Sequence, residues 1–487
     1  MKWLKRLGWF LAFPALLVLF VLLWGGFKYL TYSQSDNAVH LAAKQDYLES
    51  LRSIAATPSE QQRPNIIVIF YDDLGYGDLG ATGSQSIKTP HIDQLAANGV
   101  MLNNFYAAAP VCSPSRAALL SGRIPARAGL PQVVFPTGSW KSLINIIPGQ
   151  NVRIPAEEIL LPDMLKAAGY RTGMVGKWHI GDRAPSLPNN FNFDSYYGAL
   201  YSNDMEPFAL YRDGKVEVEA PADQTKLDDL YTTEAVRFIA AQGDGEEPFF
   251  LYFAHNFPHI PLFTSPAMAG KSAAGLYGDV VESLDQGVGR LVAALKVNNQ
   301  FENTIIIITS DNGPWYEGSP GNARGRKGMT FEGGMHEPFI IHWPAGLAGG
   351  RKLDGMAMAT GLLPTFADWL SLPLPKDRTI DGKSLRRLLE GEGEQVHDYL
   401  YYFAANDLMA VRDARFKYHD RQPIHYVLSG NSLSLPTQHG PWLFDLQNDP
   451  DESYDVSGKY PEVAKRLRQA MLAKRTEMEA NKRGWQD

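Results

Sequence analysis

The only cysteine of the chain lies in a setting that favours chemistry on an anion. Cys112 stands between Pro110 and Pro114, and Arg116 follows before an alanine and leucine run that predicts the start of a helix. A lone thiol forms no intrachain disulfide, and this spacing lacks the paired ligands of a zinc site. One interpretation is a buried, inert thiol. The other is a reactive position, because a helix N-terminus and a guanidinium group both favour negative charge there.

Three apolar segments run directly into polar residues. Residues 66–70, 249–254 and 304–309 predict strands that are buried on both faces. The acidic, amide and histidine residues that follow these strands are Asp72, Asp73, His255, His259, Asp311 and Asn312. Ligands bind beyond the carboxyl ends of the strands in α/β sheets, so we expect one shared site.

The carboxylate and amide groups in this set are hard oxygen donors. Such donors suit Ca²⁺ or Mg²⁺ better than zinc. Adjacent side chains in a strand point to opposite faces, so Asp72 and Asp73 can share one metal only if the strand has already ended. Gly75 and Gly77 favour a loop at that point. One such pair alone could be a solvated turn, but two pairs after similar strands favour a metal site.

The residues around the cysteine resemble a known signature. CSPSR at residues 112–116, followed by LLSGR at 119–123, is similar to the signature of type I sulfatases, and GYRTGMVGKWH at 169–179 resembles the second signature of that family. The resemblance extends from residue 65 to the C-terminus. It implies an arylsulfatase-like hydrolase of the alkaline phosphatase superfamily. The implied fold is α/β, with a large mixed sheet flanked by helices and a smaller C-terminal antiparallel sheet with a terminal helix.

The resemblance also implies site residues and cofactors. In the family, a maturation enzyme converts the cysteine to formylglycine (3-oxoalanine), whose hydrated aldehyde attacks the sulfur of a sulfate monoester. The matching ligands of a calcium ion, which we expect rather than magnesium, are Asp72, Asp73, Asp311, Asn312 and the modified Cys112. The matching catalytic residues are Arg116, Lys177, His179, His259 and Lys327, together with Cys112. Lys177, His259 and Lys327 also match substrate-binding positions, and Ser202 is a further candidate.

Several of these positions have plainer alternatives. A lone lysine is usually a solvated surface group, and Arg324 and Arg326 could supply the cation instead of Lys327. For His255 we favour a structural role. His336 stands where many family members have arginine, which cautions against transferring further details of the pocket.

The N-terminus predicts export. Lys2, Lys5 and Arg6 precede an apolar run at residues 8–27 that is long enough to span a bilayer, and they favour a cytoplasmic N-terminus. We expect a signal anchor, with a cleaved signal peptide as the alternative. A bacterial periplasm would suit a chain without disulfides or Asn-x-Ser/Thr acceptors.

We divide the chain into an N-terminal segment (1–31), a tether with one amphipathic helix (32–63), a catalytic domain (64–373) and a C-terminal subdomain (374–487). In the last part, the segments predicted as short strands and a final helix are 399–404, 408–412, 416–419, 442–446 and 461–481. The net charge of −7 and the lack of a long basic run argue against nucleic acid as a partner. The sequence leaves the oligomeric state open.

Two other functions fit parts of this pattern. One is a phosphonate monoester hydrolase or phosphodiesterase of the same superfamily, and the other is a non-catalytic protein that binds sulfated glycans. The nearly complete catalytic set favours a sulfatase, because sites rather than folds determine function. Sugar, aryl and steroid sulfates all remain open as substrates. Export and the aromatic residues of the long connection at 130–159 favour a sulfated sugar.

Overall fold

The computed structural model describes residues 16–17, 20, 23–55, 62–243, 247–421, 424–428, 431–435 and 440–486, with 424–428 and 431–435 described by their backbone alone. Residues 1–15, which begin the predicted anchor, lie outside this set, and residues 23–31 form a helix. Among the described helices, none combines the length and the hydrophobicity needed to cross a membrane. The anchor therefore stays a prediction.

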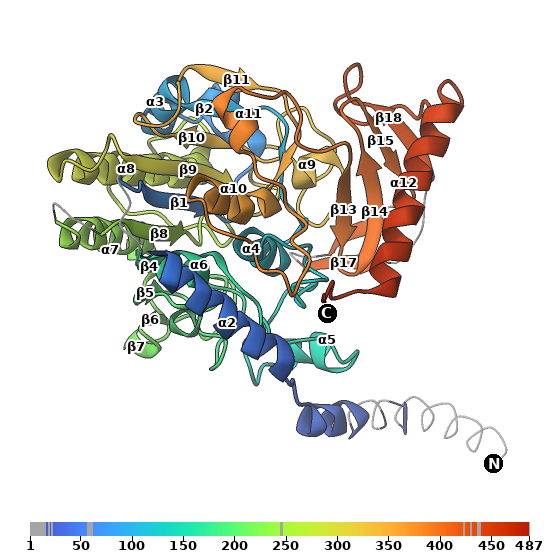
Figure 1. Cartoon of the computed structure of the whole chain (residues 1–487), viewed down its shortest axis with the longest axis horizontal. Helices are drawn as coiled ribbons and strands as arrows, with labels where there is room; N and C mark the ends of the chain where they lie inside the picture. Colours follow the sequence, from blue (N-terminus) through green and yellow to red (C-terminus); the bar gives the residue numbers. More distant parts are fainter. Residues whose placement is uncertain are drawn as a thin grey trace, which may run out of the picture.

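A large mixed sheet forms the centre of the molecule (Figure 1), with the strand order β11-β2-β10-β9-β1-β8-β4-β5-β6-β7. Its strands are β1 (Asn65–Tyr71), β2 (Val100–Leu102), β4 (Arg171–Gly176), β5 (Ser195–Gly198), β6 (Leu210–Arg212), β7 (Lys215–Val218), β8 (Phe249–Ala254), β9 (Thr304–Ser310), β10 (Ile340–His342) and β11 (Arg351–Leu353). The four strands β9, β1, β8 and β4 are adjacent and parallel. Three of these four are the strands predicted from their apolar runs.

Helices cover both faces of this sheet and bury two separate cores. In β1, Ile66 and Val68 belong to one core, and Ile67 and Ile69 belong to the other. The helices packed on the first core are α2 (Ala38–Ala55), α4 (Cys112–Ser121), α6 (Leu161–Ala167), α10 (Leu362–Trp369) and α11 (Arg386–Glu390). Those on the second core are α3 (Pro90–Asn98), α7 (Leu227–Ala241) and α8 (Gly275–Val297). Burial on both faces explains why β1 is a continuous apolar run.

A smaller antiparallel sheet forms the C-terminal subdomain beside the central sheet (Figure 1). Its strands are β13 (Leu400–Ala404), β14 (Asp407–Arg412), β15 (Phe416–His419) and β18 (Trp442–Asp445). Helix α12 (Pro461–Ala480) packs on it through Leu467 and Met471. The remaining short elements are β3 (Phe105–Tyr106), α5 (Leu143–Ile146), α9 (Glu332–Met335), β12 (Ala357–Met358) and the hairpin of β16 (Ile424–Leu428) with β17 (Asn431–Leu435). The fold predicted from the sequence is confirmed in both of its parts.

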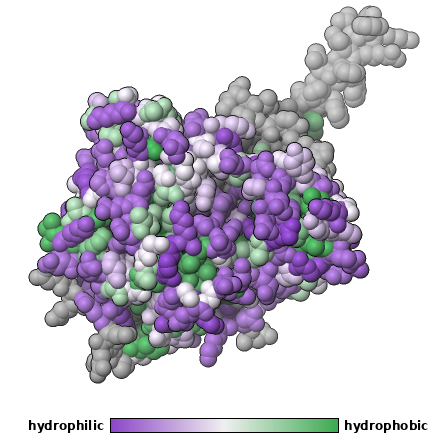
Figure 2. Space-filling view, turned by 90° about the horizontal axis from the view of Figure 1, so that it is seen from above, coloured by the Kyte–Doolittle hydropathy of each residue, from purple (hydrophilic) through white to green (hydrophobic). Residues whose placement is uncertain are grey.

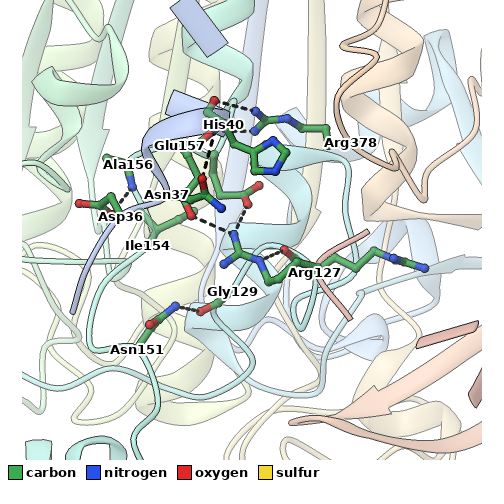
Figure 3. Close-up of polar contacts among 12 residues, drawn as sticks. Asp36, Asn37, His40, Arg127, Gly129, Asn151, Ile154, Ala156, Glu157 and Arg378 are labelled. Atoms are coloured by element: carbon green, nitrogen blue, oxygen red, sulfur yellow. Dashed lines mark hydrogen bonds and ion pairs between the residues drawn. The ribbon is translucent and has the colours of Figure 1, made fainter. Parts of the chain in front are cut away.

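The segment predicted as a tether is docked on the catalytic domain. Asp36 forms an ion pair with Arg153 at 2.7 Å and accepts a hydrogen bond from the backbone of Ala156 at 2.9 Å. Within α2, the backbone carbonyl of His40 accepts a hydrogen bond from Arg378 (Figure 3). Lys44 of α2 is buried against Asp163 at 2.8 Å. These charged contacts fix the position of α2, the amphipathic helix expected within this segment.

The outer surface differs sharply from these cores. Figure 2 shows hydrophilic residues over most of one face of the molecule, with hydrophobic residues in small separate groups between them. The large apolar side chains of strands β1, β4, β8 and β9 are buried instead. The hydrophobic effect is therefore concentrated at the two faces of the sheet, which makes the sheet a firm support for residues at its edge.

Candidate active site

Four parallel strands end in register at one edge of the central sheet. Tyr71 of β1 is paired with Ser310 of β9, and Phe70 is paired with Ala254 of β8. Gly176 of β4 is also paired with Ala254. The polar residues that follow these strands therefore begin at the same edge, where α/β sheets bind ligands.

The two adjacent aspartates both face the site because the strand has ended before them. β1 ends at Tyr71, and Asp73 adopts a left-handed backbone conformation with φ of 64°. Oxygen atoms of Asp72, Asp73 and Asp311 and the sulfur of Cys112 all lie within 4.8 Å of one another. These four residues are buried, so their ligand atoms converge on one small internal volume.

This volume fits a hard divalent cation. The side-chain NH2 group of Asn312 donates to Asp73 at 2.7 Å, while its side-chain oxygen, Oδ1, has no hydrogen-bond partner among the described residues. Oδ1 of Asp72 is likewise buried without a hydrogen bond. Buried polar atoms are almost always hydrogen-bonded, so these two oxygens, of which Asp72 Oδ1 lies 3.6 Å from Arg116, fit a partner that takes oxygen ligands.

Cys112 is the first residue of α4 and is almost fully buried. Burial raises the pKa of its thiol far above the ordinary value, despite the nearby Lys177 and Lys327. The thiolate is the nucleophilic form of cysteine, so the unmodified side chain would be a poor nucleophile here. The sulfur marks the position that the oxygens of a formylglycine hydrate would take.

Three cations balance the three carboxylates. Arg116 pairs with Asp311 at 2.8 Å and donates a hydrogen bond to the backbone carbonyl of Lys177 at 3.1 Å. Lys177 pairs with Asp72, and Lys327 pairs with Asp73 at 2.8 Å. All six of these side chains except Lys327 are almost completely inaccessible to solvent. The site therefore holds a dense but balanced set of buried charges.

The pKa values of two of these carboxylates, Asp72 and Asp311, are shifted in opposite directions by their surroundings. Burial would raise the pKa of Asp72, but Lys177, His259 and Arg116 together hold it well below its usual range. Burial and the charge of Asp72 raise the pKa of Asp311 to about 7. Neighbouring groups whose pKa values are pushed apart are characteristic of functional sites.

The two predicted catalytic histidines have different surroundings. Nε2 of His179 lies 3.1 Å from the carbonyl oxygen of Val134 and must donate to it, while Nδ1 is buried and has no hydrogen-bond partner in the described part of the chain. Burial and the nearby Lys177 hold the pKa of His179 well below its usual value, so it is neutral. Nε2 of His259 lies 3.7 Å from Asp73, and its Nδ1 bonds to the carbonyl of Ile260.

The structure also decides between the alternatives left by the sequence. Arg326 donates to the carbonyls of Trp315 and Gly318, and Arg324 donates to the carbonyl of Glu452, so Lys327 is the cation that reaches the aspartates. Nδ1 of His255 accepts a hydrogen bond from the backbone N–H of Phe257 at 2.9 Å, and its Nε2 lies 3.5 Å from Asp228, so its structural role stays a prediction. His336 stacks on Tyr76 and Tyr106.

Ser202 is the predicted residue that the structure does not join to the others. Its hydroxyl is buried and has no hydrogen-bond partner among the residues described. Its neighbour Asn203 was missed, although it donates to the carbonyls of His259 at 3.4 Å and Pro261 at 2.9 Å. Asn203 therefore holds the loop that carries His259. The contact joins residues more than fifty positions apart, and no local pattern marks it.

Comparisons with known proteins agree with this site. The family model described as "Sulfatase" matches residues 64–372, and that of the C-terminal part of N-sulphoglucosamine sulphohydrolase matches 326–477. N-acetylgalactosamine-6-sulfatase of Sus scrofa is 36% identical over 84% of this chain and 85% of that protein. Arylsulfatase A of Homo sapiens is 34% identical over 87% of this chain and 90% of that protein. A solved structure from work on the metabolism of multiple glycosaminoglycans by Bacteroides thetaiotaomicron matches with a TM-score of 0.77 and 28% identity, over 85% of this chain and all of that one.

The chain belongs to the sulfatase family. Family membership and the structural neighbours make it a sulfuric ester hydrolase of the alkaline phosphatase superfamily.

Proposed function

We propose that this sulfatase hydrolyses the sulfate monoester of a carbohydrate, using a formylglycine made from Cys112 and a calcium ion. The observation that carries the proposal is the convergence of Cys112 with Asp72, Asp73 and Asp311 within 4.8 Å at the N-terminus of α4. A maturation enzyme that acts on Cys112 is then a required partner. When formed, the hydrated formylglycine supplies a hydroxyl nucleophile, which a buried thiol with a raised pKa cannot replace.

We place a calcium ion on Asp72, Asp73, Asp311 and Asn312. Their donor atoms are hard oxygens, and the free Oδ1 atoms of Asp72 and Asn312 support their role as ligands. When bound, the ion supplies positive charge that stabilises the nucleophile and the sulfate oxygens. Magnesium is the less favoured alternative, because it demands a stricter octahedral arrangement.

The cations of the site divide into two roles. Arg116 is fully buried against Asp311 and the carbonyl of Lys177, so it holds the site together and orients the residues around position 112. Lys177 and Lys327 pair with aspartates that we assign to the metal, and a divalent cation on those aspartates would leave both ammonium groups for the sulfate oxygens. Preorganised charges of this kind stabilise a transition state that carries negative charge.

The two histidines would move protons in opposite directions. His179 is neutral, and its free Nδ1 is available to accept a proton at position 112. Nδ1 of His259 donates to the carbonyl of Ile260 and Nε2 faces Asp73 at 3.7 Å, so the doubly protonated imidazolium form of His259 would give its Nε2 proton to the departing alcohol and return to the neutral ring. Proton transfer by positioned histidines contributes about 10² to 10⁴ to rates in enzymes. Ser202 remains a candidate for contact with the sulfate.

The nature of the alcohol is inferred from relatives. The pig protein is named for N-acetylgalactosamine 6-sulfate, and the matching Bacteroides structure comes from work on glycosaminoglycans. We therefore favour a sulfated sugar and expect the enzyme to be exported, as its N-terminal sequence predicts. The N-terminal segment would then attach it to a membrane unless a signal peptidase removes it.

A parallel substrate screen tests this function. Purified enzyme should release inorganic sulfate from sulfated monosaccharides and from p-nitrophenyl sulfate, and the Cys112→Ala variant should release none. Faster turnover of phosphonate monoesters or phosphate diesters than of any sulfate ester would contradict the proposal. Retention of sulfated glycans without any turnover would favour the binding-protein alternative.

A further inference from the structure

The loop that carries Lys327 (residues 325–334, here the Lys327 loop) lies between Cys112 and the C-terminal subdomain. On one side, the backbone N–H of Gly328 donates to the carbonyl of Pro110 at 2.7 Å, two residues before Cys112. The N–H of Lys327 donates to the carbonyl of Pro314 at 3.1 Å. The first bond ties the loop to the turn that presents Cys112, and the second ties Lys327 to the segment that follows Asp311 and Asn312.

The other side of the loop faces the C-terminal sheet. Helix α9 begins at Glu332, five residues after Lys327, and lies between the two sheets (Figure 1). The Glu332 carboxylate bonds to Lys417 of β15 at 2.8 Å and accepts from the Tyr106 hydroxyl at 2.6 Å. The Glu332 backbone N–H donates to the carboxylate of Glu452 at 2.6 Å. Two residues of the C-terminal subdomain, Lys417 and Glu452, therefore both bond to Glu332 of the loop.

These contacts form a closed set of buried charges, which we call the Glu332 cluster: Glu332, Arg412, Lys417, His419 and Glu452. Lys417 also pairs with Glu452 at 3.2 Å, and His419 lies 3.0 Å from Glu452. Arg412 lies 3.7 Å from Glu332. Two carboxylates thus face two permanent cations, and each member is at most 5% exposed. Such a cluster has a single satisfactory geometry, because misplacing one member leaves a buried charge unpaired.

The loop is rich in glycine, and an internal bond from the Gly333 N–H to the Arg324 carbonyl at 2.7 Å closes it. Gly325 and Gly328 adopt left-handed conformations with φ of 86° and 87°. Gly333 is pressed against the backbone, since an added Cβ would lie 2.4 Å from the carbonyl oxygen of Gly325. Glycine permits these conformations without enforcing them. The contacts at the two sides of the loop therefore add to its internal bonds in setting the position of Lys327.

We propose that Lys417 and Glu332 are positioning residues, through which the C-terminal subdomain sets the place of Lys327 in the sulfate site. This inference rests on the proposed role of Lys327 in binding the sulfate. It gives the C-terminal subdomain a part in catalysis although no residue of it is among the predicted catalytic residues. Displacements near 1 Å can cost about 100-fold in enzymes, so a loosened loop should be measurable.

A pair of matched variants tests the proposal in the full-length, matured enzyme. Lys417→Met removes the cation that bonds Glu332. The control, Lys44→Met, removes a buried cation of α2 that pairs with Asp163 at 2.8 Å. The hydrogen bonds of Lys44 go to the carbonyls of Ala156 and Glu158, and none of these three partners belongs to the Lys327 loop. Methionine keeps the length of the side chain without its charge. We expect both variants to lose thermal stability.

The expected difference is in sulfate affinity. Lys417→Met should raise the Kd for inorganic sulfate, measured by calorimetry, and the KM for p-nitrophenyl sulfate by about 10- to 100-fold. Lys44→Met should leave both within about twofold, since additivity holds for distant sites. Lys417→Arg should recover most of the affinity. The double variant Lys327→Met/Lys417→Met should bind sulfate no more weakly than Lys327→Met alone, because Lys417 acts through Lys327.

Equal sulfate affinity in Lys417→Met and the unaltered enzyme would overturn the inference and leave the cluster with a purely structural role. Additive losses in the double variant would overturn it as well. If Lys417→Met does not fold, Glu332→Gln is measured in its place, with the same expected rise in Kd. An unaltered enzyme that neither binds sulfate nor hydrolyses its esters would contradict the proposed function itself.

Discussion

Two clusters of buried charge lie at opposite sides of the Lys327 loop, and they differ in how completely they are satisfied. In the Glu332 cluster, all four carboxylate oxygens of Glu332 and Glu452 have partners within the chain, and among its oxygen and nitrogen atoms Nδ1 of His419 is buried without a hydrogen bond in the described residues. In the active site, Oδ1 of Asp72 lies 3.6 Å from Arg116 but accepts no hydrogen bond, and Oδ1 of Asn312 and Nδ1 of His179 have no hydrogen-bond partner among the described residues.

The difference lies in the oxygen atoms, because only the active site has buried carboxylate or amide oxygens without a hydrogen bond among the described residues of the two clusters. A buried polar atom without a partner costs free energy, so it persists only where something else satisfies it or uses it. A balance of formal charges does not make the distinction, since both clusters contain equal numbers of carboxylates and permanent cations. The distinction comes from oxygen atoms that make no hydrogen bond, those of Asp72 and Asn312, beside the converging carboxylates.

The largest effect is expected at the nucleophile. Cys112→Ala should lower kcat for any sulfate ester by about 10⁴-fold or more, because nothing else in the site can attack sulfur. Cys112→Ser should behave similarly in hosts whose maturation enzyme accepts only cysteine. Sulfate release is the measurement, with circular dichroism as the check on folding. Unchanged turnover by Cys112→Ala would refute the mechanism.

A smaller loss is expected when the free histidine nitrogen is removed. His179→Ala should lower kcat by about 10²- to 10⁴-fold, since it deletes the proposed proton acceptor at position 112. Steady-state kinetics should show the loss mainly in kcat. His255→Ala is the control, because His255 bonds to the backbone of its own turn. Equal losses in both variants would argue that His179 is structural.

Stabilisation by bound calcium should depend on the active site and not on the Glu332 cluster. Adding Ca²⁺ to EGTA-treated enzyme should stabilise it by about 3 kcal/mol when the ion is about 100-fold above its Kd. Asp72→Asn should weaken this response, because a ligand charge is lost, whereas Glu332→Gln should retain it. Thermal unfolding with and without the ion gives the answer. A calcium response that survives in Asp72→Asn would place the ion elsewhere.

The Glu332 cluster should be visible in the pH dependence of stability. Burial would raise the pKa of Glu332, but Lys417 and Arg412 lower it to about 2. Its contribution is therefore complete above the unfolded value of about 4.3 and is lost as the pH falls towards about 2. Glu332→Gln should cost about 3 kcal/mol at neutral pH, and the difference should shrink on acidification.

Urea unfolding at a series of pH values measures this trend. The control is Glu247→Gln, which alters an exposed ion pair with Arg171 and should cost less than about 1 kcal/mol at any pH. A constant difference between Glu332→Gln and the unaltered enzyme down to about pH 2 would show that the carboxylate charge of Glu332 does not stabilise the fold.

Much of the fold could be predicted because its strongest signals are local. The run at residues 304–309 lies within β9, and that at 249–254 coincides with β8, since strands buried on both faces are continuously apolar. The residues after β1 and β9 include the predicted metal ligands Asp72, Asp73, Asp311 and Asn312, and Asp73 has the non-strand conformation that this prediction required.

The remaining features depend on contacts between distant parts of the chain. Nothing near Lys417 indicates that it meets Glu332, a residue 85 positions away. The ion pair of Lys44 with Asp163 and the hydrogen bond from Asn203 to the carbonyl of His259 also join residues that are far apart in the sequence. A single sequence shows which side chains are polar and where elements end, but it does not show which polar groups meet in the interior.

The measurement that tests the central claim most directly is the mass of the tryptic peptide Thr89–Arg116, from protein purified from its own host. The proposed mechanism predicts an aldehyde or its hydrate at position 112, in place of the thiol. Intact cysteine in folded, exported protein that still hydrolyses sulfate esters would contradict it.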